Sequence, residues 1–455
     1  MTTAAQPLQA RRFSVAHLAM LAPWVALVIG SWGVIGDNSF LWHVRAGSLQ
    51  RSVGEVLTTD PFSFTMNGAP WRTQSWLIEL LYDWSEGIAG LSFVPIMILL
   101  VGTITFVTIA LLAYRRSRSV AATAFVLVLT TIILVSFLVP RPVLFSFALM
   151  SLVMLAWDRP QTRWAVPFLF WLWASIHASF LIGLAYIGLT LIMEREWREL
   201  LKAVVSGLVT LLTAHGLGVV TFLLDFTQGR EALTHLTEWR RPDFSDPFFI
   251  AYLGGILFCV IGFVRRTLPL RWLWVVLPFA VLGLTSVRAI PPAWLGLVPA
   301  VAAALQGLAI GTRAGLRPQL ALIFTGFVLL LPFFLIDGSE LSEERFPLDA
   351  RMALDAGRTF HDDVVGGYLI WAEGPERQVY LDDRAELYRS RLEEFVQIRQ
   401  GDLGWENVFE RDGIEQALLK REVDENLVEE LSSAGWATVH SDEYFVVLRP
   451  EEQTG

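Results

Sequence analysis

Ionisable side chains gather in a polar stretch near the N-terminus, directly after the first long hydrophobic run of the chain. Asp37 opens this stretch, and a carboxylate at such a boundary could act as a general base or hold a divalent cation such as Mg²⁺ or Mn²⁺. His43 and Asp60 follow it, and both residue types take part in acid–base catalysis. We therefore predict that Asp37, His43 and Asp60 are catalytic, with Asp37 also the candidate metal ligand.

Each of these residues also has a purely structural interpretation. Asp37 could end a helix or start a turn, and a single loop histidine such as His43 often has only a structural role. Asp60 precedes a proline, and Asp-Pro is a common start of a turn. A loop that only joined two helices would need a handful of residues, so the length of residues 37–89 favours a functional role.

A second set of polar residues could bind a substrate. Arg141 lies between two prolines, which fix the backbone and suit a guanidinium that grips an anionic group such as a phosphate. Arg288 precedes a proline pair in a similar way, although arginines at a membrane interface also extend to lipid headgroups. The candidate substrate-binding residues are Arg45, Arg72, Glu79, Arg141, His177, His215, Glu238, Trp239, Arg240 and Arg288.

The composition predicts an α-helical polytopic membrane protein. Hydrophobic residues make up 54% of the 455 residues and charged residues only 17%, and the mean hydropathy is +0.50. A soluble chain of this length would need more charge to cover its surface. We expect a transmembrane domain over 15–336 with eleven segments, most of them near the roughly 20 residues that cross a bilayer. The expected segments are 15–36, 90–114, 120–139, 142–157, 164–176, 178–193, 200–223, 248–264, 272–288, 290–310 and 317–336.

Basic clusters assign a side of the membrane to each loop. Arginines recur between the hydrophobic runs, as at Arg115-Arg116 and Arg265-Arg266, and such clusters stay in the cytoplasm. If 164–193 crosses twice, with a break near His177, all the clusters fall on one side. This interpretation places the N-terminal residues 1–14 in the cytoplasm. It places the large first loop, 37–89, and the C-terminal domain on the extracytoplasmic side.

Residues 337–455 have the character of a soluble domain. They contain 29 acidic and 12 basic residues, a net charge of −17, whereas the preceding part has a net charge of +8. β-Branched and aromatic residues predict strands here, and helical apolar spacing predicts helices. The predicted strands are Val364–Trp371, Gln378–Leu381, Trp436–Val439 and Tyr444–Leu448, and the predicted helices are Leu387–Arg399 and Glu422–Ser433. We expect a small α/β domain.

Several familiar signatures are absent from the sequence, namely G-x-x-x-x-G-K-[ST], H-E-x-x-H, G-x-S-x-G and G-x-G-x-x-G. Their absence argues against the usual nucleotide-driven and zinc-hydrolase classes. The basic residues flank hydrophobic runs, so we expect no nucleic-acid partner. Cys259 is the only cysteine and lies in an apolar run, which excludes an intramolecular disulfide.

A series of short motifs resembles the GT-C glycosyltransferase superfamily, and more narrowly bacterial GT-C-like integral membrane proteins. The matching pieces cover nearly the whole chain and are D-x4-W-H-x3-G, DPFSFT, WLIE, RPVLFSF, IHASFLIG, AHGLG, EWRRPDF, GGYLIW and YLDDRAELY. In that superfamily the acid of the first loop is the catalytic base or metal partner, and Asp37 matches it here. Asn38 stands where many members have a second acid.

The resemblance implies a function and a location. A sugar would pass from a polyprenyl-phosphate-linked donor to an extracytoplasmic glycan, lipid or protein acceptor. Arg141 or Arg288 would grip the donor phosphate. The protein would be a multi-pass protein of the bacterial inner or plasma membrane.

Two other classes stay open. A multi-pass transporter or flippase of an envelope precursor would favour internal repeats and charges near the middle of helices, and neither is clear in the sequence. A non-catalytic envelope assembly protein is the other class. In any of the three classes, Asp382-Asp383-Arg384 of the C-terminal domain could bind a partner or the acceptor. In every class the lipid bilayer is a partner.

Overall fold

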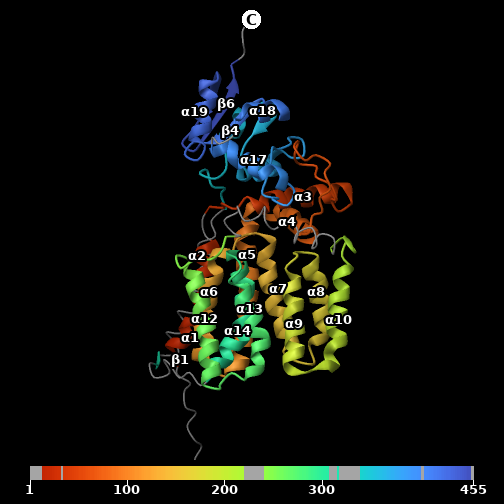
Figure 1. Ribbon diagram of the computed structural model, residues 1–455, viewed down its shortest axis with the longest axis vertical. Helices are drawn as coiled ribbons and strands as arrows, with labels where there is room; N and C mark the ends of the chain where they lie inside the picture. The colour runs from red at the N-terminus through yellow and green to blue at the C-terminus, as the bar shows by residue number, and fades with distance from the viewer. Residues whose placement is uncertain are drawn as a thin grey trace, which may run out of the picture.

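The computed structural model describes residues 13–31, 34–219, 240–306, 315–316, 339–400 and 404–451. The described chain is mostly helical, with a small sheet near the C-terminus. Figure 1 shows a group of upright helices with the C-terminal domain at one end of it. Two helices of the first loop, α3 (Ser39–Val53) and α4 (Trp76–Ala89), lie between these two parts. We call the end of the upright helices that faces the C-terminal domain the domain end, and the opposite one the far end.

Apolar segments of the sequence form the upright helices. Within the described residues, four helical runs are long and apolar enough to cross a membrane: Trp76–Ser117, Val120–Phe137, Pro247–Val264 and Val287–Ala304. Shorter apolar helices accompany them. The upright helices are α1 (Val15–Ala19), α2 (Ala22–Ser31), α5 (Phe93–Ser117), α6 (Val120–Leu134), α7 (Pro142–Trp157), α8 (Val166–Ala174), α9 (Phe180–Glu194), α10 (Leu200–Leu208), α12 (Pro247–Val264), α13 (Leu273–Leu282) and α14 (Ile290–Ala304).

The predicted break near His177 is confirmed, because α8 ends at Ala174 and α9 begins at Phe180. The count of eleven membrane spans stays a prediction. Both α8 and α10 have only 9 residues, which is short for a crossing. The last expected span, 317–336, lies outside the described residues.

Large apolar side chains cover the outward faces of the upright helices. Leu100 and Leu111 of α5, Leu257 of α12 and Leu277 of α13 are all exposed. Soluble proteins rarely leave contiguous apolar surfaces of this kind uncovered, whereas lipid-facing helices do. The fold is therefore that of a membrane-associated helical protein.

Ion pairs join the loops at the far end. Arg116, at the end of α5, pairs with Asp158, which follows α7, at 2.5 Å. Arg163, which precedes α8, pairs with Glu196, which follows α9, at 2.6 Å. Loops that carry several of the basic clusters therefore meet at the same end of the helices.

The C-terminal domain is built on a four-stranded sheet. Its strands are β3 (Thr359–Phe360), β4 (Gln416–Lys420), β5 (Trp436–Ser441) and β6 (Phe445–Pro450), in the order β3-β4-β6-β5. β3 runs parallel to β4, and the other pairs are antiparallel. The predicted closing hairpin is confirmed as β5 and β6. The strands β3 and β4 and the short helix α18 (Glu406–Asp412) were not predicted from the sequence.

Both predicted helices of this domain are confirmed, as α17 (Arg389–Gln400) and α19 (Glu425–Ser433). The predicted strand Val364–Trp371 is wrong, because these residues belong to helix α16 (Asp363–Glu373). The side chain of Asp362 accepts the backbone N–H of Val365 at 2.8 Å and caps the helix. Gly366 allows a close approach, since a Cβ atom there would lie 1.9 Å from the Leu381 carbonyl oxygen. Capping and packing thus override the strand propensity of the sequence.

The prediction of a strand at Gln378–Leu381 is also wrong with respect to the sheet. Val379 instead forms an isolated parallel bridge with Ser63 of the first loop. Its N–H donates to the Phe62 carbonyl at 2.9 Å, and its carbonyl accepts from Phe64 at 3.1 Å. The segment therefore connects the C-terminal domain to the first loop.

The start of the C-terminal domain pairs with the residues just before Asp37. The N–H of Ile35 donates to the Glu340 carbonyl at 2.8 Å, and the N–H of Ser342 donates to the Ile35 carbonyl at 3.0 Å. Together with the bridge at Val379, this pairing fixes the first loop and the C-terminal domain against each other.

Candidate functional site

Asp37 and Arg141 form an ion pair at the domain end of the upright helices. The Arg141 Nε donates to Asp37 Oδ2 at 2.7 Å. Asp37 Oδ1 accepts the backbone N–H of Ser39, the first residue of α3, at 3.0 Å. Arg141 directly precedes α7, with an extended backbone between its two prolines. The fold thus brings together two predicted site residues that are 104 positions apart in the sequence.

A cleft of about 260 Å³ includes Asp37 in its wall. Apolar residues from α5, from the segment after α2 and from the turn before α7 form part of it, including Ile98 and Leu138. Polar groups lie at one side, where Arg345 donates to the Gly36 carbonyl at 3.0 Å. The cleft therefore combines an apolar wall from the helices with a charged rim.

His43 and Glu79 form a buried pair between α3 and α4. His43 Nδ1 lies 2.8 Å from Glu79 Oε1, and the side chains are 8% and 0% exposed. Gln50 donates to Glu79 Oε2 at 2.6 Å. When Nδ1 of a neutral imidazole donates to the carboxylate, Nε2 is left as the proton acceptor. This is the geometry of a histidine that can act as a general base.

Close helix packing makes the His43–Glu79 contact possible. Gly47 lies one turn after His43 on α3, and a Cβ atom at Gly47 would lie 2.0 Å from the Glu79 carbonyl oxygen. Only glycine therefore allows the two backbones to approach this closely.

Thr73 extends this network towards the upright helices. Its hydroxyl donates to Glu79, and its carbonyl oxygen lies 2.6 Å from His215 Nε2. The fold thus links His43, Glu79 and His215, which the sequence predicted separately. Arg72 lies beside them and donates to the Gly218 carbonyl at 3.5 Å.

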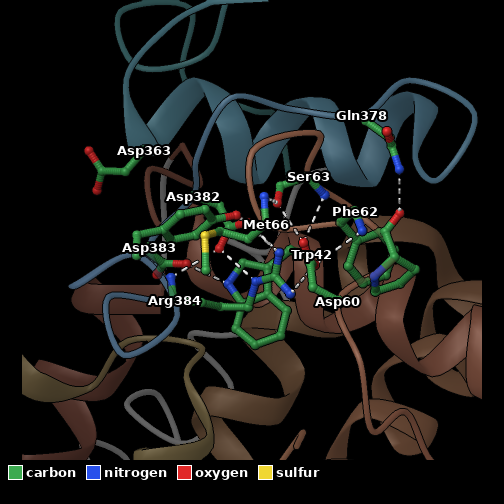
Figure 2. A network of polar contacts seen from close by, with 12 residues as sticks. Trp42, Asp60, Phe62, Ser63, Met66, Asp363, Gln378, Asp382, Asp383 and Arg384 are labelled. Atoms are coloured by element: carbon green, nitrogen blue, oxygen red, sulfur yellow. Dashed lines mark hydrogen bonds and ion pairs between the residues drawn. The ribbon is translucent and has the colours of Figure 1, made fainter. Parts of the chain in front are cut away.

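Asp60 belongs to a different, fully buried network, which Figure 2 shows. Its carboxylate pairs with Arg384 at 2.8 Å and accepts the backbone N–H groups of Phe62 and Ser63. Arg384 also donates to both oxygens of Asp382, at 2.7 and 2.6 Å. The guanidinium lies 4.4 Å from the centre of the Trp71 ring. Asp60 is 1% exposed, so this carboxylate holds the first loop to the C-terminal domain. Its catalytic role stays a prediction.

The charges of Asp37 and Arg141 act on Asp383 in the C-terminal domain. The indole N–H of Trp42, on α3, donates to Asp383 Oδ1 at 2.5 Å. Burial raises the pKa of Asp383 to about 7, against the favourable charge of Arg141 and with the added repulsion of Asp37 and Asp382. A carboxylate that titrates near neutral pH is suited to exchanging protons with a substrate.

The remaining predicted residues have other contacts or lie outside the described chain. His177 makes local contacts with Ser179 at the start of α9. Arg240 pairs with Asp243 and Asp246, and Arg288 is exposed. Arg45 donates to Gly374 and Glu376 of the C-terminal domain. Glu238 and Trp239 lie outside the described residues.

The described residues contain no group of three or more His, Cys, Asp or Glu side chains that could hold a metal ion. The two partners of Asp37 are an N–H group and a guanidinium, which compete with a cation for its oxygens. The predicted divalent cation therefore has no support from this donor set.

The comparisons with known proteins do not identify a family. No protein-family model matches the chain, and no curated protein matches it. The fold therefore defines only a broad class: a mostly helical protein with apolar helices that could cross a membrane and a small C-terminal sheet domain. The GT-C resemblance stays a prediction.

The contacts between the site residues were harder to predict from the sequence than the residues themselves. The segment Asp382-Asp383-Arg384 was predicted to bind a partner or the acceptor, whereas in the fold the charges of Asp37 and Arg141 act on Asp383. The adjacent acids Asp382 and Asp383, between a predicted strand and a predicted helix, were a sequence signal for a functional site. Thr73 and Gln50 gave no signal, because their role depends on the packing of α3 on α4.

Proposed function

We propose that the protein is a membrane glycosyltransferase, which transfers a sugar from a polyprenyl-phosphate-linked donor to an extracytoplasmic acceptor. The observation that carries this proposal is the ion pair between Arg141 and Asp37, which lines a cleft with both apolar and polar walls. Lipid-linked donors combine a long apolar chain with a charged headgroup. Few other substrates would need both kinds of surface at the end of membrane helices.

Arg141 binds the donor phosphate in this proposal. Phosphate leaves as the sugar is transferred, so a fixed positive charge beside it lowers the barrier. Asp37 holds the guanidinium in position through its contact with Nε. The polyprenyl chain lies against the apolar residues of α5, of the segment after α2 and of the turn before α7.

Asp383 takes the proton of the acceptor hydroxyl in this proposal. The hydroxyl oxygen forms a bond with the anomeric carbon, and the bond from that carbon to the phosphate oxygen breaks. The proton passes to the Asp383 carboxylate, and the electron pair leaves with the polyprenyl phosphate. Asp37 is less suited to this step, because both of its oxygens already accept hydrogen bonds. His43, with Glu79, is the second candidate base.

The domain end faces the extracytoplasmic side in this proposal, at a bacterial inner or plasma membrane. The joined basic loops of the far end support this orientation, because such loops stay in the cytoplasm. A topology reporter fused after Glu340 should therefore be active outside the cytoplasm, and one fused after Arg118 should be active inside. The reverse result would contradict the orientation.

The Asp37→Asn variant tests the proposal at the site itself. The amide keeps the shape of the side chain and can still accept the Ser39 N–H, but it loses the charge that holds Arg141. We expect sugar transfer to fall by at least about 100-fold, as for the loss of a preorganised charge. Membrane insertion should be unchanged. The matched control is Glu429→Gln on exposed α19, which should transfer sugar at the wild-type rate.

A deletion strain separates the transferase from a transporter or flippase. Loss of a transferase should cause a polyprenyl-phosphate sugar to accumulate. Accumulation of an untransported solute or precursor, with normal sugar transfer in membranes, would contradict the proposed function.

A further inference from the structure

A groove follows the boundary between the first loop and the C-terminal domain. It consists of two adjoining hollows of about 350 and 630 Å³, which share Arg45 and Ala372. The smaller one lies between α3, α4 and α16, and the larger one extends to Gln378. Asp37, Arg141 and Asp383 do not line either hollow, so the groove is separate from the proposed catalytic groups. We call it the Arg45 groove.

Arginines gather in the Arg45 groove although the domain around it is acidic. Arg351, Arg358 and Arg377 of the C-terminal domain line it together with Arg45 of α3. The domain has only 12 basic residues against 29 acidic ones. The lining has four arginines and three glutamates, so the groove carries a small positive charge within an acidic domain.

Two of these arginines have donors that a ligand could use. Arg45 pairs with Glu376 at 3.1 Å, but the Glu376 side chain is 76% exposed, and ion pairs with such exposed partners contribute little. Arg351 pairs with Glu373 at 3.4 Å, and these two side chains are also partly exposed, at 27% and 29%. A planar guanidinium with unused N–H groups suits carboxylate and phosphate.

Aromatic rings and carboxylates lie among the arginines. Trp371 lines the smaller hollow and donates its indole N–H to Glu86 at 2.8 Å. Tyr368 lies beside it, with Arg351 5.9 Å from the ring centre. Aromatic faces attract C–H groups, and carboxylates accept hydrogen bonds from hydroxyl groups. A chain of sugars offers both.

The groove also begins near the proposed catalytic groups. Arg45 lies six residues after Ser39 on α3, which corresponds to about 9 Å along the helix axis. Ser39 is itself bonded to Asp37. A chain in the groove could therefore extend one end towards the Asp37–Arg141 pair.

We propose that the Arg45 groove binds an anionic oligosaccharide. Its carboxylate or phosphate groups contact Arg45 and Arg351, and its sugar rings pack on Trp371. Resting on the proposed function, the bound chain is the acceptor, and its end receives the new sugar. Binding itself does not depend on catalysis.

Titration calorimetry of the full-length protein in detergent tests the groove. The probes are oligogalacturonates, which carry carboxylates, oligomers of glycerol phosphate with attached sugars, and neutral malto-oligosaccharides of similar length. We expect at least one anionic probe to bind about tenfold more tightly than the neutral one, because charged hydrogen bonds are the stronger ones. The better of the two anionic probes identifies the group that the arginines recognise.

Two variants and a control locate the binding. Arg45→Ala and Arg351→Ala should each weaken binding of the preferred probe by about tenfold. Arg421→Ala, an exposed arginine of the same domain outside the groove, should bind as the wild type does. Unchanged affinity in both groove variants would overturn the proposal. Equal affinity for the neutral probe, or for poly-glutamate, would also overturn it.

The Asp37→Asn variant separates this inference from the proposed function. It should bind the oligosaccharide with wild-type affinity, because Asp37 lies outside the groove. Binding in the wild type without any sugar transfer would leave the groove intact and contradict the transferase. Transfer without selective anion binding would contradict the groove alone.

Discussion

At the scale of single residues, the proposed chemistry depends on the different environments of two carboxylates, Asp37 and Asp383. One carboxylate oxygen of Asp37 accepts the backbone N–H of Ser39, at the start of α3, and the other accepts from Arg141. The side chain of Asp37 is therefore fixed in place, and the guanidinium balances its charge. Asp383 accepts a hydrogen bond from the indole of Trp42, and burial and the neighbouring acids disfavour its charge. Two carboxylates near each other thus have different environments, which is a common way to separate positioning from proton transfer.

In the proposed mechanism, the transfer rate should depend on pH through Asp383. Its pKa is raised to about 7, and its neighbours Arg141, Asp37, Asp382 and Asp363 carry the charges that act on it. Since only the ionised form accepts a proton, the rate should rise as pH increases through about 7. Asp383→Asn should remove this rise and lower the rate at pH 8 by about 100-fold.

Stability distinguishes a catalytic role of Asp383 from a structural one. A carboxyl group whose pKa is raised on folding stabilises the protein at low pH, and this contribution is lost as pH rises through 7. Asp383→Asn should therefore be at least as stable as the wild type above pH 7. A variant that transfers sugar normally, or that is inactive only because it unfolds, would contradict the assignment.

At the scale of secondary structure, the packing of α3 on α4 controls the His43–Glu79 pair. Gly47→Ala would place a methyl group 2.0 Å from the Glu79 carbonyl oxygen. We expect a loss of about 1–3 kcal/mol in the free energy of unfolding, as for overpacking. Gly87→Ala on α4 is the control, because a Cβ atom there meets nothing within 4 Å. Denaturant titration of both variants checks the difference, and equal stability would contradict the packing argument.

Local sequence patterns predicted most elements but not every contact. The apolar runs predicted the upright helices, the break near His177 and the final hairpin, because these depend on short-range periodicity and turns. Residues 364–371 were wrongly predicted as a strand, since valine, tyrosine and isoleucine favour strands. The helix there depends on the Asp362 cap and on the fit of Gly366 against Leu381, which no local pattern contains.

The site was also predictable only in part, because local sequence patterns do not contain contacts between distant residues. Position in the chain indicated Asp37 and Arg141 separately, but their contact depends on the arrangement of α2, α3 and α7. Asp60 was predicted as catalytic, whereas the fold places it in a buried ion pair with Arg384. A partner more than 300 residues away could not be deduced from the Asp-Pro turn.

At the scale of the whole molecule, Arg384 joins the first loop to the C-terminal domain. It lies between Asp60 of the loop and Asp382 of the domain, and it is 1% exposed (Figure 2). Arg384→Met should lower the free energy of unfolding by about 3–5 kcal/mol, because two buried carboxylates lose their counter-charge. Tryptophan fluorescence during denaturation of the full chain would measure this loss, since Trp71 packs on the guanidinium.

The exposed Arg421→Met is the matched control for this prediction and should unfold as the wild type does. An Arg384 variant with wild-type stability would mean that the first loop and the C-terminal domain are held together elsewhere. Because Asp383 follows Asp382 directly, loosening this contact should also lower sugar transfer.

The release of polyprenyl phosphate by the purified protein tests the central claim most directly. The full-length protein, reconstituted in lipid vesicles, would be mixed with labelled polyprenyl-phosphate sugars and acceptor glycans. We predict that the wild type releases free polyprenyl phosphate and labels the acceptor in equal amounts, and that Asp37→Asn does neither. Two results would contradict the proposed glycosyl transfer. One is an intact donor after incubation with folded wild-type protein, and the other is the same release of polyprenyl phosphate by Asp37→Asn.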